Sequence, residues 1–317
     1  MTAENPITPL LERQGVVILD GGLAAELEAR GADLDHELWS ARYLQEDPDL
    51  IRRIHLDYLD AGADCVISAS YQATVRGFRK QGLSDEEAVA LLRRSVELAC
   101  AARDDFWDRA PAGRLRPLVA ASVGAYGAYL ADGSEYTGRY DLDEAGLTEF
   151  HRRRFRILAA SGADLLACET LPSGPEARAL LRLLGESPGA WAWFSFTCRD
   201  EIHLSDGTPL AEMAAELDGA RQVVAVGVNC TAPRFIPALI SELRRSTRKP
   251  VVVYPNSGET YDAERKAWSD LASPPDFGQL SSVWFDRGAS LVGGCCRTGP
   301  RHIRQIRSRL LGAPPAA

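Results

Sequence analysis

The chain has 317 residues, of which 45% are hydrophobic and 25% charged, a composition typical of a globular protein with a full apolar core. Its formal net charge of −8 argues against nucleic acid or an anionic membrane surface as the main partner. Residues 1–10 lack a basic segment followed by an apolar run, and no apolar stretch approaches the roughly 20 residues of a membrane span. We therefore expect a cytoplasmic protein.

Along the chain, apolar segments alternate with segments of helical periodicity. Three predicted helices end at a glycine, at Gly62, Gly162 and Gly288, and a buried strand begins shortly after each of them. The predicted strands cover residues 16–19, 65–69, 117–123, 165–168, 191–197, 223–228, 251–254 and 291–293. The predicted helices cover residues 49–61, 85–107, 142–160, 174–184, 209–217, 233–245, 277–286 and 300–311.

This alternation predicts an α/β protein with the (β/α)8 barrel architecture, because each strand is apolar throughout, as parallel strands buried on both faces are. A doubly wound open sheet is the alternative, but no G-x-G-x-x-G motif follows the first strand. No linker or change in composition divides the chain, so we expect one domain over residues 1–317, with a frayed tail at 312–317.

A barrel of this kind carries its active site at the C-terminal ends of the strands. Residues of reactive types follow five of the predicted strands. They are Asp20, Glu169, Cys230, Asn256 and the pair Cys295–Cys296. The predicted fold thus gathers acids, an amide and thiols at one end of the barrel.

The seven cysteines, at positions 65, 100, 168, 198, 230, 295 and 296, are odd in number and scattered, unlike a disulfide framework. Adjacent side chains of a regular strand point to opposite faces, so Cys295 and Cys296 can serve one site only if the backbone leaves extended geometry, which the glycines at 293–294 permit. With Cys230 from another strand end, they form a set of three sulfur ligands that suits a catalytic zinc with one open position. The alternative is that all three are simply buried, as we expect for the other four.

Zinc held by three thiolates activates water poorly but stabilises a further thiolate, so the set favours alkyl transfer to a substrate thiol. Asp20 and Glu169 are candidates to bind the ammonium group of an amino-acid substrate. For either residue alone, a helix cap or a hydrogen bond at the barrel mouth is the alternative role.

Five short motifs resemble the homocysteine S-methyltransferase family over essentially the whole chain. They are LDGG at 19–22, CET at 168–170, GVNC at 227–230, PNSG at 255–258 and GGCC at 293–296. Segments 69–74, 122–136 and 204–209 are similar to the bacterial and plant branch, which uses S-methylmethionine and, less well, S-adenosylmethionine as methyl donor.

The resemblance implies that Zn²⁺ is bound by Cys230, Cys295 and Cys296 and that homocysteine sulfur takes the open position. Asp20 and Glu169 would then bind the amino group of homocysteine. The resemblance also implies that the side-chain oxygen of Asn256 occupies the fourth position on zinc until substrate displaces it, and that the product is methionine.

Three tyrosines in loops after the second and third strands, Tyr71, Tyr126 and Tyr129, are candidates to contact the donor, because a sulfonium attracts aromatic faces. Packing at the barrel mouth is the alternative for each. The expected partners are small molecules, with a monomer and a homo-oligomer both compatible with the sequence. Two other functions are left open: methyl transfer to a thiol from betaine or another donor, and a non-catalytic zinc or thiol-redox barrel.

Overall fold

A computed structural model of the chain describes residues 4–109, 112–258, 261–262, 267–268 and 276–312. Of the predicted tail, residues 313–317 lie outside this description. The main sheet consists of β1 (Val17–Ile18), β2 (Cys65–Ile67), β3 (Leu118–Gly124), β4 (Leu165–Leu171), β5 (Ala192–Phe196), β6 (Val223–Asn229), β7 (Val251–Tyr254) and β10 (Ala289–Val292). Two short strands, β8 (Tyr261–Asp262) and β9 (Ala267–Trp268), form a separate antiparallel pair.

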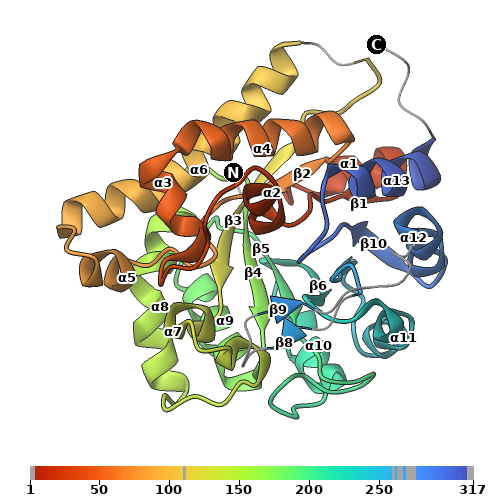
Figure 1. Cartoon of the computed structure of the whole chain (residues 1–317). Coiled ribbons are helices and arrows are strands. Elements are labelled where there is room, and N and C mark those ends of the chain that lie inside the picture. The colour runs from red at the N-terminus through yellow and green to blue at the C-terminus, as the bar shows by residue number, and fades with distance from the viewer. Residues whose placement is uncertain (1–3, 110–111, 259–260, 263–266, 269–275, 313–317) are drawn as a thin grey trace.

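The main sheet is a closed parallel barrel (Figure 1). Its strand order is β1-β10-β7-β6-β5-β4-β3-β2, and every pair of neighbours is parallel. A parallel bridge between Leu19 and Cys65 joins the first strand to the second and closes the ring. The predicted (β/α)8 barrel is therefore confirmed, and the open doubly wound sheet is excluded.

Helices surround the barrel, and the eight predicted from periodicity are all present. They are α4 (Pro48–Ala61), α6 (Asp85–Asp108), α8 (Glu144–Ala159), α9 (Gly174–Gly185), α10 (Leu210–Asp218), α11 (Ile236–Ser246), α12 (Phe277–Asp286) and α13 (Pro300–Leu311). Several short helices and 3-10 turns were not predicted. They are the helices α1 (Thr8–Gln14), α2 (Leu23–Ala29), α3 (Tyr43–Glu46), α5 (Val75–Lys80) and α7 (Tyr126–Leu130), and the 3-10 turns η1 (Trp39–Arg42), η2 (Ser134–Tyr136) and η3 (Pro233–Phe235). These pieces are too short for a periodic pattern to reveal.

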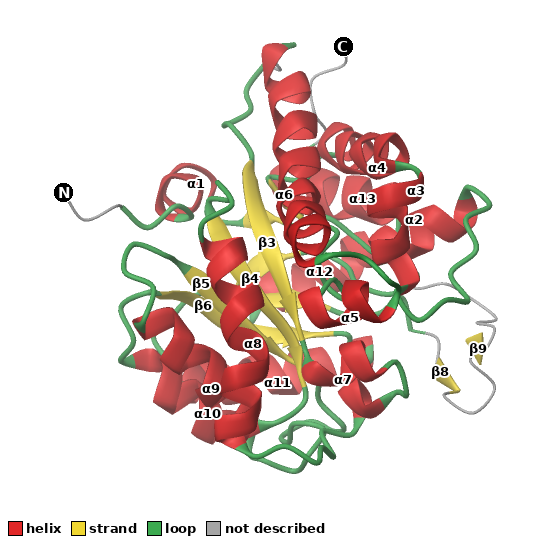
Figure 2. Ribbon diagram, turned by 90° about the vertical axis from the view of Figure 1, so that its left-hand side faces the viewer, coloured by secondary structure: helices red, strands yellow, loops and turns green. Residues whose placement is uncertain are grey.

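Two apolar layers stabilise the barrel, because successive strand residues point alternately inward and outward. Ala167 and Trp193 belong to the cluster that fills the barrel interior, together with Ile7 and Leu10 from the α1 region. Cys168, next to Ala167, belongs instead to the large cluster shared by the strands and the surrounding helices. Figure 2 shows α1 at the opposite end of the barrel from α7, which lies at the C-terminal ends of the strands.

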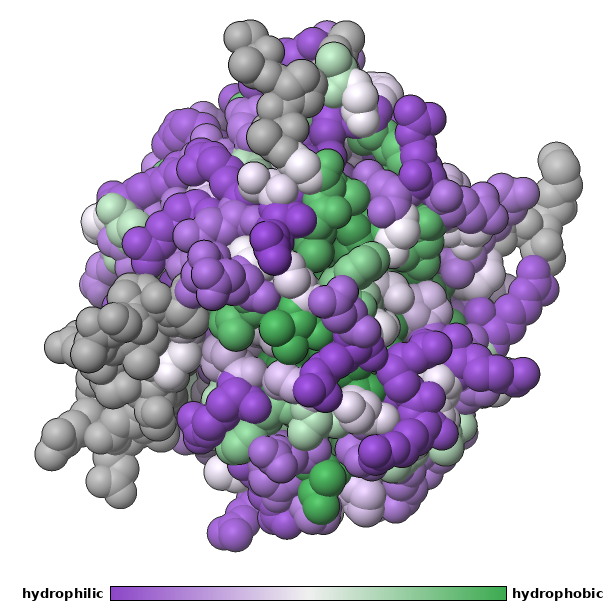
Figure 3. Space-filling model, turned by 90° about the vertical axis from the view of Figure 1, so that its right-hand side faces the viewer, coloured by the Kyte–Doolittle hydropathy of each residue, from purple (hydrophilic) through white to green (hydrophobic). Residues whose placement is uncertain are grey.

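The outer surface is mostly polar. Figure 3, which views the molecule from the right-hand side of Figure 1, shows apolar side chains in patches among hydrophilic ones. The large apolar side chains exposed on the described chain are Ile202, Val283 and Phe285. Among the described helices, none is both long and apolar enough to cross a bilayer.

Candidate active site

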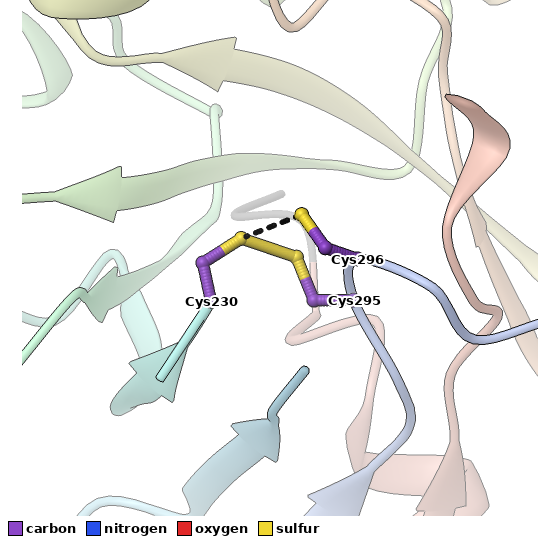
Figure 4. A group of neighbouring side chains, drawn as sticks. All are labelled: Cys230, Cys295 and Cys296. Carbon is purple, nitrogen blue, oxygen red and sulfur yellow. Dashed lines mark hydrogen bonds between the residues drawn. A yellow bond between two sulfur atoms is a disulfide. The ribbon is translucent and has the colours of Figure 1, made fainter. Parts of the chain in front are cut away.

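The predicted site residues lie at the C-terminal ends of the barrel strands. Asp20 follows β1, Glu169 lies near the end of β4, Cys230 directly follows β6, Asn256 follows β7, and Cys295–Cys296 follow β10. Figure 4 shows how the three cysteine side chains point toward one another from two separate loops.

The three thiols form one compact cluster. The sulfur atoms of Cys230, Cys295 and Cys296 all lie within 4.8 Å of one another. Cys230 and Cys295 are joined as a disulfide, with Cα atoms 5.6 Å apart, and Cys296 Sγ lies 3.9 Å from Cys230 Sγ (Figure 4). Three sulfurs this close can surround one metal ion when they are reduced, so the cluster has both an oxidised and a metal-binding arrangement available to it.

The two glycines before the cysteine pair are required for close packing. A Cβ on Gly293 would lie 2.6 Å from Leu19 Cβ, and one on Gly294 would lie 2.3 Å from Thr298 Oγ1. As expected, the chain leaves the strand before the cysteine pair, since β10 ends at Val292. Neither glycine has a positive φ, whereas Cys230 does, at 46°. The absence of side chains at Gly293 and Gly294 thus lets the loop pack closely against the first strand and the following turn.

Polar side chains of the neighbouring strand ends surround the sulfurs. Asn229 Nδ2 donates to Thr170 Oγ1 at 2.7 Å and lies 3.9 Å from Cys295 Sγ. Thr170 Oγ1 lies 3.8 Å from Cys230 Sγ. Sequence reasoning gave neither residue a role, although each directly adjoins a predicted site residue in the GVNC and CET motifs. Both supply N–H or O–H dipoles that stabilise negative charge on sulfur.

A third contact comes from a segment that the sequence analysis did not assign to the site. The hydroxyl of Tyr136 hydrogen-bonds to the Cys296 side chain. Burial raises the pKa of the Cys296 thiol to about 12; the Tyr136 bond opposes this rise, and the nearby charge of Glu135 adds to it. With Cys230 and Cys295 joined, burial therefore favours the protonated form of this thiol.

Asn256 lies in the loop after β7, next to the loop of the cysteine pair. Its Oδ1 is buried and has no hydrogen-bond partner in the described structure. Its loop is tied to the cysteine pair, because Ser257 N donates to the Cys296 carbonyl at 3.1 Å and Cys295 N to the Pro255 carbonyl at 2.8 Å. Three soft sulfurs and one free oxygen fit zinc better than magnesium or calcium, which prefer all-oxygen ligand sets.

Two carboxylates at the strand ends, Asp20 and Glu169, lie near enough to affect each other's charge. Asp20 Oδ2 accepts from the backbone N–H of Ile67 at 2.8 Å, while its buried Oδ1 has no partner among the described residues. Glu169 Oε1 accepts from the Ser122 hydroxyl, and Oε2 accepts from the Tyr254 hydroxyl at 3.0 Å. Both side chains are buried, with 3% of Asp20 and 7% of Glu169 exposed.

Burial controls how these two acids ionise. It raises the pKa of Asp20 well above its usual range, and the charge of Glu169 raises it further, while the Ile67 amide acts in the opposite direction. Burial also raises the pKa of Glu169 to about 7, against the hydrogen bonds from Ser122 and Tyr254. A buried acid pair with an unpaired oxygen is suited to an ammonium group, because the ammonium supplies both a positive charge and N–H donors to the carboxylates.

The three candidate tyrosines are divided between two places. Tyr71 lies at the site, since its hydroxyl is hydrogen-bonded to the Thr170 side chain and feels the charge of Cys296. The rings of Tyr126 and Tyr129 stack on each other. Both also pack against Phe150, Tyr126 edge-to-face with centroids 4.8 Å apart and Tyr129 at a tilt with centroids 5.1 Å apart. These contacts favour the packing role for Tyr126 and Tyr129.

The remaining cysteines behave as expected of packing residues. Cys65, Cys168 and Cys198 are buried, and Cys100 on α6 is half-buried. Within the described chain, the potential metal-binding group contains none of them.

Comparisons with known proteins agree with this geometry. The family model described as homocysteine S-methyltransferase matches residues 17–310. The homocysteine S-methyltransferase YbgG of Bacillus subtilis is 51% identical, over 95% of this chain and 96% of the relative. The crystal structure of the metallated homocysteine methyltransferase MmuM from Escherichia coli superposes with a TM-score of 0.87 at 49% identity, covering 96% of this chain and all of that one. An oxidised form of the same enzyme matches equally well, with a TM-score of 0.87 at 48% identity. The chain therefore belongs to the homocysteine S-methyltransferase family.

Proposed function

We propose that the enzyme transfers a methyl group from an amino-acid sulfonium, S-methylmethionine or S-adenosylmethionine, to the sulfur of L-homocysteine and so forms methionine. Zn²⁺ would be held by Cys230, Cys295 and Cys296, with Asn256 Oδ1 available as a displaceable fourth ligand. The observation that carries this proposal is the cluster of three sulfurs at the strand ends, and the buried, unpaired amide oxygen of Asn256 supports it. When bound, zinc would lower the pKa of the substrate thiol and keep it nucleophilic at neutral pH.

The acid pair positions the acceptor. Asp20 Oδ1 is buried without a partner, and Glu169 is fixed by two hydroxyl groups, so an ammonium placed between them gains charge-assisted hydrogen bonds. Homocysteine carries such a group three carbons from its sulfur. Binding its amino end at the acids would direct its thiol toward the cysteine cluster.

The chemistry is a single displacement. The homocysteine thiol loses its proton to solvent, and its sulfur forms a new bond to the donor methyl carbon. The bond between that carbon and the donor sulfur breaks, with its electron pair remaining on the donor, which leaves as a neutral thioether. Holding the two sulfurs and the carbon in line is the main contribution of the protein. Such a thiol-dependent enzyme suits the reducing cytoplasm.

The test is methionine formation from homocysteine and S-methylmethionine labelled in its methyl groups, followed by mass spectrometry. We expect label in methionine, loss of activity with chelator, and recovery with Zn²⁺. Cys230→Ser should lose both metal and activity, whereas Cys100→Ser, far from the cluster on α6, should keep both.

Two results would contradict the proposal. Full activity in rigorously metal-free protein would exclude zinc as the group that prepares the thiol. Tight zinc binding without any homocysteine binding would instead indicate a non-catalytic zinc barrel. Betaine belongs in the same assay as a competing donor, and efficient transfer from it would assign a different donor class.

A further inference from the structure

Glu135, in the η2 turn, is a half-buried acid that the proposed chemistry has not yet used. Its Oε2 is buried and has no hydrogen-bond partner, and no ion pair joins the residue to a cation within the described chain. A buried carboxylate oxygen without a partner is unfavourable unless a ligand supplies a donor or a positive charge. The question is therefore which ligand group this oxygen meets.

The turn places Glu135 beside the reacting centre. Its neighbour Tyr136 hydrogen-bonds to Cys296, so η2 is attached to the thiol cluster. The Glu135 charge also lies near enough to raise the pKa of Tyr71, whose hydroxyl is bonded to Thr170. One carboxylate and two tyrosine rings thus flank the cysteines, in addition to the acid pair of Asp20 and Glu169.

The turn is closely packed in this position. A Cβ on Gly127 of α7 would lie 2.2 Å from the backbone N of Glu135, so the turn packs directly on the helix backbone. The start of α7 is fixed in turn, because Tyr126 N donates to the buried carboxylate of Glu176 at 2.6 Å. On the other side, a Cβ on Gly124 would lie 2.3 Å from the Tyr71 carbonyl oxygen. Such preorganisation is expected of ligand-binding groups.

Two amino acids must meet at the cysteine cluster, and each brings an ammonium group. The site offers two unpaired, buried carboxylate oxygens, Asp20 Oδ1 and Glu135 Oε2. A sulfonium offers such an oxygen a positive charge but no N–H, whereas an ammonium offers both a charge and a hydrogen bond. Aromatic faces such as those of Tyr71 and Tyr136 suit the sulfonium. The number and kind of unpaired groups match two amino-acid substrates.

We propose that Glu135 binds the ammonium group of the methyl donor, so that the enzyme selects amino-acid sulfonium compounds over donors that lack an α-amino group. This inference rests on the proposed methyl transfer and names the substrate class of its donor side. It excludes betaine and simple sulfonium carboxylates as efficient donors.

The first test is steady-state kinetics of Glu135→Gln, an isosteric change that removes the charge. We expect the KM for S-methylmethionine to rise about tenfold or more, the effect of losing one charge-assisted hydrogen bond, with the KM for homocysteine unchanged. Asp132→Asn is the matched control, because Asp132 is an exposed acid on the same segment whose Oδ1 accepts from Ser134 N, a contact that asparagine can keep. Glu135→Asp should lie between wild type and Glu135→Gln.

A comparison of donors adds the readout that a purely structural role would not change. Wild type should use S-methylmethionine far better than dimethylsulfoniopropionate, a sulfonium carboxylate without an α-amino group. In Glu135→Gln this preference should collapse, because only the amino-acid donor loses its partner. An unchanged donor KM, an equal loss for both donors, or an equal rise in the KM for homocysteine would each overturn the inference.

Direct binding separates this inference from the proposed function. Calorimetry with S-methylmethionine and the metal-loaded protein, without homocysteine, measures donor affinity when no transfer can occur. Weaker binding to Glu135→Gln than to wild type supports the inference even if wild type transfers no methyl group, a result that would contradict only the proposed function. Equal donor affinity of the two proteins overturns the inference, whatever the turnover.

Discussion

Replacing Glu169 by glutamine should stabilise the substrate-free protein above pH 7 while it weakens homocysteine binding. Burial raises the pKa of this carboxyl from 4.5 to about 7. A raised acid pKa means that folding favours the protonated form, so the stability of wild type is complete below about pH 4.5 and is lost as the pH rises through about 7. Glutamine does not ionise, so the stability of Glu169→Gln should lack this dependence on pH.

The magnitude follows from the same two values. The interval between 4.5 and about 7, converted at about 1.4 kcal/mol per pH unit, gives about 3.5 kcal/mol as the upper limit for ionising Glu169 in the folded protein. Glutamine must still pair with the hydroxyls of Ser122 and Tyr254, and reorienting them offsets part of this gain. We expect a net stabilisation of about 1–3 kcal/mol at about pH 8 and almost none at pH 5. Removing the Glu169 charge should also let Asp20 ionise more readily.

The assay is chemical denaturation of wild type and Glu169→Gln at several pH values between 5 and 8, with homocysteine affinity measured by calorimetry on the same preparations. Glu97→Gln, an exposed acid on α6, serves as the control and should show no pH-dependent difference. Homocysteine affinity should fall about tenfold or more in Glu169→Gln. A stability difference that is constant across this pH range would refute the reasoning, as would unaltered homocysteine binding.

Two further predictions concern the cluster and the barrel. Peroxide should join Cys230 to Cys295, release the metal and stop methyl transfer, because the two sulfurs lie within the same compact group. Thiol reductant should restore metal binding and transfer. Peptide mapping with a metal-release assay measures this, and full activity in protein that carries the disulfide would contradict it. Gly227→Ala should destabilise the fold by about 3 kcal/mol or more, since its Cβ would lie 1.7 Å from the Val252 carbonyl oxygen, and denaturation measures it. Gly219→Ala, where nothing lies within 4 Å of the added Cβ, should be nearly neutral, and an equal effect of the two changes would rule out the steric explanation.

Much of the architecture could be predicted from the sequence, because buried parallel strands and long helices leave clear patterns. Helix α6 (Asp85–Asp108), for example, begins with a serine cap and a glutamate that closes a capping box, and its predicted extent differs by one residue at its end. The convergence of Cys230 with the later cysteine pair also followed from the strand-end rule, since all barrel strands end at one face.

The rest of the site depends on loop packing, which the sequence does not encode in a periodic form. Tyr126, predicted at the donor site, lies in an apolar cluster with Phe150, whereas Tyr136, ten positions later in the same segment, reaches Cys296. Choosing between them requires knowing that α7 and η2 fold against each other at Gly127. The role of Gly293 could not be predicted either, because a close approach between distant segments leaves no local signal.

The distribution of unpaired oxygens connects stability with function in this barrel. Asp20 Oδ1, Glu135 Oε2 and Asn256 Oδ1 are all buried without partners in the described structure, and each lowers the stability of the ligand-free protein. Each also matches one component of the proposed reaction: the acceptor ammonium, the donor ammonium and the metal. Because anything that binds only the folded state stabilises it, these three ligands should each raise the unfolding temperature. The stabilisation by donor should depend on Glu135 and that by homocysteine on Asp20, so the two halves of the site can be told apart by unfolding measurements alone.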